Sequence, residues 1–411
     1  MDRSESNKEA WEAQSLISKS LLSLVAVWLL VTGVPDPAVG APEVVSFAYL
    51  ARENDPAYAP HRAYTGLVLR DRAPPLDGAK AALKESRVIG RALGLKFELE
   101  EVTLGEVDDA VAAIEAMVAG GAQIFLLDLP LADVKQAAKA LAGENVLLFN
   151  IRHGADELRG ADCSPVLFHT FASDAMLMDG LAQYLSKMTW RDVLILEGES
   201  EADRLLSATF QGAARKFGLN VVDVRPFVLS NDPRLRDQTN VPLLTGDANY
   251  DVVFLADTLG EFGRYVPYQT YAPRPVVGSE GLVPGAWHWT WERYGAPQLN
   301  QRFDRIAGRR MQDADYAAWA AVKSVVEAMA RTESRDVAVL RDYLKSDDFT
   351  LDTYKGAPGT FRAWDNQLRQ AVLLHTHNAV IASAPLEGFL HQTNNLDTLG
   401  SDQPESACRF D

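Results

Sequence analysis

The sequence has little positive charge for its length. Its 411 residues include 40 Lys and Arg against 56 Asp and Glu, which gives a formal net charge of -16. Proteins that bind nucleic acid or an anionic lipid surface need clustered Lys and Arg, and the sequence contains no such cluster. We therefore expect neither partner. The remaining composition, 47% hydrophobic and 23% charged, is that of a globular protein long enough for two hydrophobic cores.

The sequence also lacks the short motifs of common catalytic sites. It contains no G-x-S-x-G, H-E-x-x-H, C-x-x-C or P-loop pattern, so nothing predicts a nucleophilic, metalloprotease or phosphate-binding site. Of the seven histidines only His375 and His377 lie close in sequence, and no third ligand stands at a metal-binding spacing. Gly120 and Gly121 follow a predicted helix, whereas a dinucleotide-binding fingerprint precedes one. We expect no enzyme, no metal site and no cofactor.

Long hydrophobic runs are scarce. The apolar run at residues 21–34 has 14 residues, fewer than the roughly 20 that span a bilayer. It follows Lys19 and precedes small residues that end at Ala41, which is the pattern of a secretory signal peptide. We therefore predict that residues 1–41 are a cleaved signal peptide; an uncleaved single-helix anchor is the alternative.

Cysteine is scarce too, with two residues in the whole chain. Export makes Cys163 and Cys408 candidates for one disulfide bond, and two unrelated thiols are the alternative. The bond would close a loop of more than half the chain, and it could contribute about 4 to 5 kcal/mol to stability.

The sequence does contain a repeated alternation of apolar runs and helical patterns. The order strand, helix, strand, helix, strand, helix, strand fills the first part, and the alternation begins again after Pro165 with a strand at Val166. This order predicts an α/β protein of two doubly wound lobes. The predicted strands are residues 44–51, 97–102, 124–127, 146–149, 166–171, 193–197, 221–224, 252–257 and 276–279, and the predicted helices include 77–93, 107–119, 131–141, 173–188, 201–217, 313–331 and 337–344. Residues 360–364 and 369–375 are predicted to form a closing hairpin.

Polar residues follow many of the predicted strands. Ligands of doubly wound sheets bind beyond the carboxyl ends of the strands, so these residues are candidates for a binding site. Ser173 also begins a predicted helix, where backbone N–H groups suit a carboxylate. A purely structural role is the alternative for each. The candidates at the strand ends are Arg52, Asp55, Asp128, Arg152, His153, Ser173, Glu197, Asp257 and Glu280.

Aromatic residues gather in two predicted loops. Tyr58 and Tyr64 lie in residues 52–75, a loop too long for an ordinary connection between a strand and a helix. Trp287 and its neighbours Trp289, Trp291 and Tyr294 follow the last strand of the second half. Such side chains could line a cleft for a partly apolar ligand, and Tyr58 and Trp287 are our candidates. A small additional core is the alternative.

Several stretches resemble a known family. The helix DADYAAWAAVKSVVEAMA (313–330), the helix LRDYL (340–344) and the segment KGAPGTFRAWDNQLRQAVLL (355–374) resemble type I periplasmic binding proteins of the leucine and branched-chain amino acid receptor family. The stretches LRGADC (158–163), YDVVFLADTLGEFGRYVPYQTYAPRPVVGSEGLVPGAWH (250–288), EGFLHQTNNLDTLG (387–400) and PESAC (404–408) resemble more closely the ABC-transporter substrate-binding proteins associated with PQQ-dependent alcohol dehydrogenase systems.

The resemblance implies a clamshell of two Rossmann-like lobes joined by a multi-segment hinge, with connecting segments near residues 163–165, 279–284 and 346–355. The implied lobe 1 is residues 42–165 and 284–345, lobe 2 is residues 166–283 and 346–391, and the C-terminal tail is residues 392–411. Amino-acid receptors of the family bind the ligand carboxylate with Ser, Thr and backbone groups, which makes Ser173 the matching position here. The long loop 52–75 departs from the amino-acid pattern.

The function that the resemblance implies is the periplasmic substrate-binding component of an ABC transporter. Its partners would be a small organic ligand and an inner-membrane ABC permease, with a link to a PQQ-dependent alcohol dehydrogenase system. The alternative of a different class is a ligand-sensing or accessory protein for a periplasmic dehydrogenase, without transport.

Overall fold

A computed structural model of the chain describes residues 42–63 and 65–410. The predicted signal peptide, residues 1–41, lies outside the described residues, as does Tyr64. Within the described ranges, no helix combines the length and the apolar character that crossing a membrane requires.

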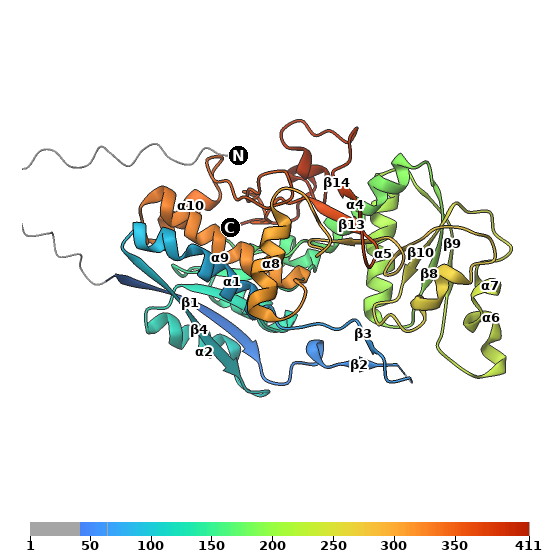
Figure 1. Cartoon of the computed structure of the whole chain (residues 1–411), viewed down its shortest axis with the longest axis horizontal. Helices are drawn as coiled ribbons and strands as arrows, with labels where there is room; N and C mark the ends of the chain where they lie inside the picture. Colours follow the sequence, from blue (N-terminus) through green and yellow to red (C-terminus); the bar gives the residue numbers. More distant parts are fainter. Residues whose placement is uncertain (1–41, 64, 411) are drawn as a thin grey trace, which may run out of the picture. The chain divides into compact units, whose positions relative to one another are not determined.

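A parallel sheet of five strands forms the centre of the first lobe (Figure 1). The order β4-β1-β5-β6-β7 places the first strand of the lobe between the second and the third. The chain therefore changes its direction of travel across the sheet between β1 and β5, and the carboxyl ends of these two strands are the topological switch point, where doubly wound sheets bind ligands. The strands are β1 (Glu43–Arg52), β4 (Leu95–Leu104), β5 (Ile124–Asp128), β6 (Leu147–Asn150) and β7 (Leu167–His169).

Helices cover both faces of this sheet. Side chains alternate along β1, so that Phe47 and Tyr49 join one core while Ala48 and Leu50 join the other. On the first face lie α1 (Leu76–Ala92), α8 (Ala296–Ala307), α9 (Asp313–Thr332) and α10 (Val337–Leu344), and on the second lie α2 (Ala110–Ala119) and α3 (Leu131–Ala140). The predicted helix 107–119 begins at Ala110, because the Asp109 side chain accepts hydrogen bonds from the first backbone N–H groups.

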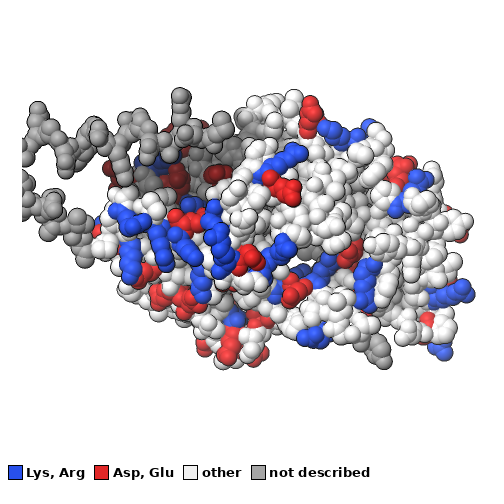
Figure 2. Space-filling model, viewed as in Figure 1, with Lys and Arg blue, Asp and Glu red and all other residues white. Residues whose placement is uncertain are grey.

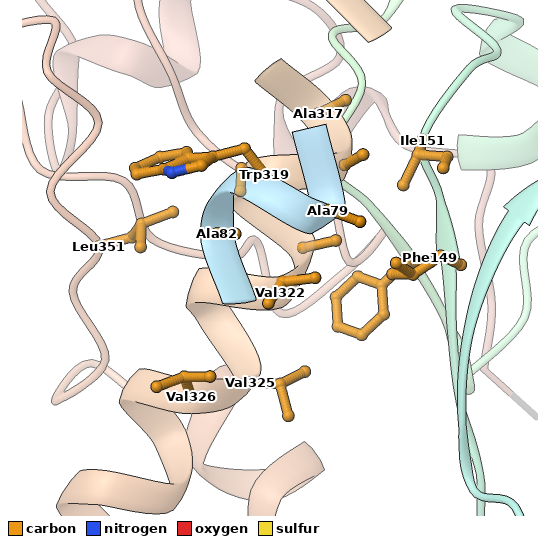
Figure 3. Packing of buried hydrophobic residues seen from close by; sticks show 14 of the residues in the cluster. Ala79, Ala82, Phe149, Ile151, Ala317, Trp319, Val322, Val325, Val326 and Leu351 are labelled. Carbon is orange, nitrogen blue, oxygen red and sulfur yellow. The ribbon is translucent and has the colours of Figure 1, made fainter. Parts of the chain in front are cut away.

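Helices α1 and α9 pack with their backbones close together. A Cβ atom at Gly78 would lie 2.0 Å from the backbone oxygen of Asp315, so only glycine fits at this crossing. The neighbouring small residues Ala79 and Ala82 continue the contact, and Figure 3 shows them beside Val322 of α9 and Phe149 of β6. The close approach positions α9 over the sheet and buries Trp319 almost completely.

A second parallel sheet forms the centre of the second lobe, in the order β11-β10-β8-β9. Its four strands follow the same order as the first four strands of the first sheet, so β8 and β10 flank a second switch point. Its core lies between the sheet and α4 and α5 on one face, and beneath short helices on the other. The elements are β8 (Asp192–Glu197), β9 (Asn220–Pro226), β10 (Val252–Ala256), β11 (Val276–Gly278), α4 (Asp174–Lys187), α5 (Glu201–Lys216), α6 (Arg236–Thr239) and α7 (Val241–Leu244).

The strand predicted to open the second lobe belongs to the first sheet. β7 pairs in parallel with β6, and Phe168 joins the core of the first lobe, whereas the helix that follows, α4, joins the core of the second. The chain therefore leaves the first sheet after His169. The predicted lobe boundaries as a whole stay a prediction.

The predicted hairpin also differs from the structure. Residues 360–364 form only an isolated bridge between Phe361 and Leu368, and the hairpin is instead β13 (Val372–His375) with β14 (Val380–Ala384), extended by β12 (Val283–Gly285). The physical reason is that the following residues bind the chain after β6. The amide side chains of Asn366, Gln367 and Gln370 donate to the carbonyl oxygens of Leu167 (3.2 Å), His169 (3.2 Å) and Thr170 (2.9 Å), respectively.

The predicted disulfide bond is confirmed. Cys163 and Cys408 are bonded, with a Cα–Cα distance of 5.6 Å. Buried charges hold the same tail: Arg362 donates to Asp397 at 2.9 Å, and both side chains are 1% exposed. The disulfide bond and this ion pair therefore both fix the tail after β14 to the molecule.

Positively charged side chains that are far apart in the sequence gather on one part of the surface. Figure 2 shows Lys and Arg side chains gathered over α1 and α8, where Lys84, Arg87, Arg91 and Arg305 are exposed. The two helices are some 200 residues apart in the sequence and lie side by side, with Arg302 bonded to Glu85 at 2.6 Å. A cluster absent from the sequence therefore forms on the folded chain.

Candidate ligand-binding site

Asp128 is the centre of the first switch point. It is the last residue of β5 and is 0% exposed. Its carboxylate accepts a hydrogen bond from the Tyr49 hydroxyl of β1 at 2.6 Å and another from the Tyr58 hydroxyl. Tyr58 belongs to the short helix η1 (Pro56–Tyr58), in the long loop after β1. Residues from two strands and a loop therefore meet at the position where the topology predicts a ligand.

Arg152, which follows β6, links Asp128 to Asp55. Its guanidinium donates to Asp128 at 3.3 Å and to Asp55 at 2.6 Å, and it lies over the Tyr58 ring, 5.1 Å from the ring centre. Asp55 also accepts from the Ala57 N–H at 2.9 Å. We call Tyr49, Asp55, Tyr58, Asp128 and Arg152 the Asp128 network.

Burial and hydrogen bonds act against each other on the carboxyl groups of this network. Burial raises the pKa of Asp128 above its ordinary value, although the bonds from Tyr49, Tyr58 and Arg152 lower it. For Asp55, burial also raises the pKa, but the bonds from Arg152 and Ala57 outweigh it and the pKa lies below its ordinary value. Burial and the charge of Asp128 raise the pKa of both tyrosines. The two tyrosine hydroxyls therefore stay protonated near neutral pH and donate hydrogen bonds. The Asp128 network thus forms a fixed wall of the candidate site.

Two further candidates at this edge have structural partners. Arg52 donates to Asp133 of α3 at 2.6 Å and to the Gly105 carbonyl oxygen at 2.7 Å. Burial lowers the pKa of His153 to about 4, so the ring is neutral near pH 7, and its Nε2 lies 2.7 Å from the Leu129 carbonyl oxygen. Both residues support the loops around the Asp128 network.

The second lobe places three predicted residues at its own strand ends. Asp257 accepts from the N–H groups of Gly260 (2.9 Å) and Gly263 (2.6 Å), so its carboxylate holds the loop after β10. Glu280, after β11, accepts from Arg70 at 2.8 Å. Glu197, the last residue of β8, is partly buried, and no described residue forms a hydrogen bond or ion pair with its side chain.

The long loop after β1 contacts both lobes. Arg70 donates to the Ser279 carbonyl oxygen at 2.6 Å as well as to Glu280, and His61 lies 3.6 Å from Glu261. Figure 1 shows the loop, with β2 (His61–Arg62) and β3 (Val68–Leu69), reaching from the first sheet towards the second lobe. The loop therefore joins the Asp128 network to the strand ends of the second sheet.

Ser173 and Trp287 do not join this site. The Ser173 hydroxyl accepts from the Met176 N–H at 3.1 Å, and the carboxylate of Asp156 accepts from the Ala175 N–H at 3.3 Å, so groups of the chain itself occupy this helix terminus. Trp287 is 2% exposed and stacks on Tyr316 with ring centres 4.8 Å apart. Ser173 caps its helix and Trp287 packs in a core. These are the structural roles given above as alternatives to ligand binding.

Sequence reasoning missed Tyr49 and Arg70. Tyr49 lies within a continuously apolar strand, where the sequence predicts a core residue. A buried tyrosine hydroxyl nevertheless needs a hydrogen-bond partner. That need, beside an aspartate at the end of a neighbouring strand, is the signal that could have identified it. Arg70 pairs with a residue 210 positions away, and no sequence pattern indicates that contact.

Comparisons with known proteins bear on the fold of this chain. A family model described as periplasmic binding protein matches residues 70–264. No curated protein sequence matches the chain. Among solved structures, a branched-chain amino acid ABC transporter periplasmic ligand-binding protein from Burkholderia xenovorans LB400 has a TM-score of 0.67 at 14% identity, over 89% of this chain and 99% of that chain.

Two further structures contain ligands. An ABC transporter substrate-binding protein from Desulfitobacterium hafniense, in complex with Leu, has a TM-score of 0.62 at 16% identity over 82% of this chain and 99% of that chain. An ABC transporter solute-binding protein from R. palustris, in complex with benzoate, has a TM-score of 0.60 at 12% identity over 89% and 99%. Likeness at these identities shows the fold, and it confirms the predicted two-lobe α/β fold.

Proposed function

We propose that this chain, which has the fold of a type I periplasmic binding protein, is the substrate-binding component of an ABC transporter. In this proposal it acts in the periplasm, captures a small organic solute between its lobes and delivers it unchanged to an inner-membrane permease. The proposed site combines the Asp128 network of the first lobe with Glu197, Asp257 and Glu280 of the second.

The observation that carries the proposal is the loop of residues 53–75. It places Tyr58 against Asp128 at one switch point and Arg70 against Glu280 at the strand ends of the other sheet. A ligand held between two lobes needs residues of both, and this loop contacts the strand ends of both sheets. Each carboxylate oxygen of Asp55 and Asp128 accepts a hydrogen bond, so neither carboxylate is free to act as a general base, which favours binding over catalysis.

The class of ligand is proposed from two sources. The similar structures that contain ligands hold leucine and benzoate, both small organic acids. The sequence stretches at residues 158–163, 250–288 and 387–400 support a link to PQQ-dependent alcohol oxidation, so the solute would be a substrate or product of that oxidation. Alcohols, aldehydes and short carboxylates are therefore the compounds to test.

Thermal unfolding of the chain from Pro42 onward tests the proposal. A ligand at 100 times its dissociation constant adds about 2.7 kcal/mol to the stability, and small-angle scattering should report lobe closure with the same compound. NMR of the compound should show no turnover. A flat unfolding temperature across alcohols, aldehydes, carboxylates, amino acids and PQQ, in a protein that unfolds cooperatively, would contradict the proposal for these solutes.

A further inference from the structure

The positive charge gathered over α1 and α8 has no part in the proposed site. On α1, Lys84, Arg87 and Arg91 are exposed, and their spacing of three and four residues places them on one side of the helix. Arg305 of α8 is exposed as well, and Figure 2 shows Lys and Arg side chains together over the two helices. We call Lys84, Arg87, Arg91 and Arg305 the α1–α8 basic face.

The acids of the two helices do not neutralise this face. Those of α1 lie close to other arginines, because Glu85 accepts from Arg302 at 2.6 Å and Asp77 lies 3.6 Å from Arg309. Asp304 is the acid of the two helices that is exposed. Among the described residues, none forms an ion pair with the four cations of the α1–α8 basic face. On a chain with a net charge of -16, this face therefore attracts an anionic surface that the remainder of the chain repels.

The chain enters the described part of the molecule beside this face. The Glu43 N–H donates to the carbonyl oxygen of Gly94 at 3.0 Å, and Gly94 follows α1, three residues after Arg91. Residues 35–41 separate the apolar run of the predicted signal peptide from Pro42, and seven residues reach at most about 25 Å. While a membrane holds the apolar run, before cleavage or in an uncleaved anchor, the α1–α8 basic face is therefore within reach of lipid headgroups.

We propose that the α1–α8 basic face binds the anionic phospholipid headgroups of the inner membrane. Each Lys or Arg beside an anionic lipid surface strengthens binding about fivefold, so four of them give a weak and reversible attachment. The attachment adds to the proposed function and does not depend on which solute is bound. The opposite expectation followed from the order of residues, in which the cations of α1 and α8 are far apart.

Attachment through this face leaves the candidate site accessible. α1 begins at Leu76, directly after the loop that contacts the Asp128 network, and its 17 residues extend about 25 Å. The cations of α1 lie in its second half, and the helix ends shortly before β4 begins at Leu95. They therefore lie towards the amino ends of the parallel strands, whereas the candidate site lies at the carboxyl ends.

Vesicle sedimentation of the chain from Pro42 onward tests the proposal. Residues 1–41 are omitted because an apolar run binds lipid by itself. Vesicles of phosphatidylglycerol and phosphatidylcholine in equal parts should bind the wild type, and vesicles of phosphatidylcholine alone should not. Raising the salt concentration from about 0.05 M to about 0.5 M should release the protein, because added ions screen exposed charges.

A pair of double variants separates the face from the net charge. Arg87→Gln with Arg91→Gln should bind the anionic vesicles about 25-fold more weakly. The matched control is Arg204→Gln with Arg215→Gln, which changes the net charge equally. Both control arginines are exposed on α5 of the second lobe, and neither forms an ion pair with a described residue. The control should bind within about twofold of the wild type, and both variants should keep its unfolding temperature within about 2 °C.

Several results would overturn the proposal. They are no binding to the anionic vesicles at low salt, equal binding to phosphatidylcholine alone, an equal loss in the control, and unchanged binding after substitution of Arg87 and Arg91. Polyglutamate, a soluble model of an acidic protein surface, is measured in parallel. If it binds this face more tightly than the vesicles do, the partner is an acidic protein and lipid attachment fails. Stabilisation by a solute is a separate measurement, so the attachment and the proposed function can fail independently.

Discussion

Replacing Arg70 with glutamine should loosen the loop that joins the two lobes. The loop is continuous with β1 and α1, so it moves with the first lobe, and Arg70 forms its hydrogen bonds to the second, beside the longer contact of His61 with Glu261. The guanidinium donates to the Ser279 carbonyl oxygen at 2.6 Å and to Glu280 at 2.8 Å. Arg70→Gln removes both contacts, whereas Glu280→Gln removes only the charge of one partner.

The contacts themselves give the size of the effect. A charged donor to a carbonyl oxygen contributes about 1.5 to 3 kcal/mol, and the lower end applies because the Arg70 side chain is 31% exposed. The partly exposed ion pair adds about 0.5 kcal/mol. Arg70→Gln should therefore cost about 2 kcal/mol, which is roughly a 30-fold change in an equilibrium constant. Glu280→Gln should cost about 0.5 kcal/mol, or roughly twofold.

Hydrogen exchange of the backbone amides at residues 61–73 measures this change without any ligand. The Ala63 N–H bonds to the Leu67 carbonyl oxygen at 2.9 Å, and the Ala73 N–H bonds to Gln312 at 3.2 Å. These amides exchange when the loop opens, so their protection should fall by about 30-fold in Arg70→Gln and about twofold in Glu280→Gln. Amides of β8, in the other lobe, serve as the internal control.

Two results would refute the reasoning. Unchanged protection in Arg70→Gln would mean that the loop is held in place without the bond to the second lobe. Equal losses in Arg70→Gln and Glu280→Gln would mean that the ion pair, rather than the bond to the Ser279 carbonyl oxygen, carries the contact.

Three further predictions concern stability. Cys163→Ser, measured by denaturant unfolding, should lower the free energy of unfolding by about 2 to 5 kcal/mol because the loop it closes spans 245 residues; wild-type protein treated with reductant should match it. Asp397→Asn removes the carboxylate that Arg362 and Arg369 share and leaves the buried Arg362 only the more distant Asp365, at 3.8 Å; it should cost about 3 kcal/mol, and a loss below about 1 kcal/mol would show that Asp365 replaces it. Burial raises the pKa of Asp313 to about 6, above its value near 3.8 in the unfolded chain. The folded state therefore binds the proton more tightly, and this contribution is full below pH 4 and is lost as pH rises through 6. Stability of the wild type relative to Asp313→Asn should fall by about 3 kcal/mol over that window, and parallel pH profiles would contradict the assignment.

The strand ends were the part of the site that the sequence could predict. Asp55, Asp128 and Arg152 stand in loops or at ends of strands, and the parallel order of a doubly wound sheet is enough to bring them to one edge. For Ser173 the structure shows a helix terminus that contacts groups of the chain itself, which the sequence did not predict. Nothing in the sequence indicates that Asp156 folds back onto that terminus.

Contacts between distant residues account for the remaining differences. The strand at residues 167–169 could pair with either sheet, since three apolar or neutral residues fit both, and only the contacts with β6 and with residues 366–370 decide it. The sequence predicts Trp287 in a loop, but its ring stacks on Tyr316 of α9 and is buried there. The alternation of strands and helices predicted the architecture, whereas the partners of individual side chains depended on residues far along the chain.

The amides of Asn366, Gln367 and Gln370 give the connection between the lobes a mechanical property. Each donates to a backbone oxygen at the place where the chain leaves the first sheet: Leu167 and His169 belong to β7, and Thr170 follows it. Residues 366–370 are thereby hydrogen-bonded at three points to β7 and to the residue after it. A rotation of one sheet relative to the other would have to move residues 366–370 together with the chain that leaves β7, which couples the two segments. The lobes would then meet in the same register each time they close.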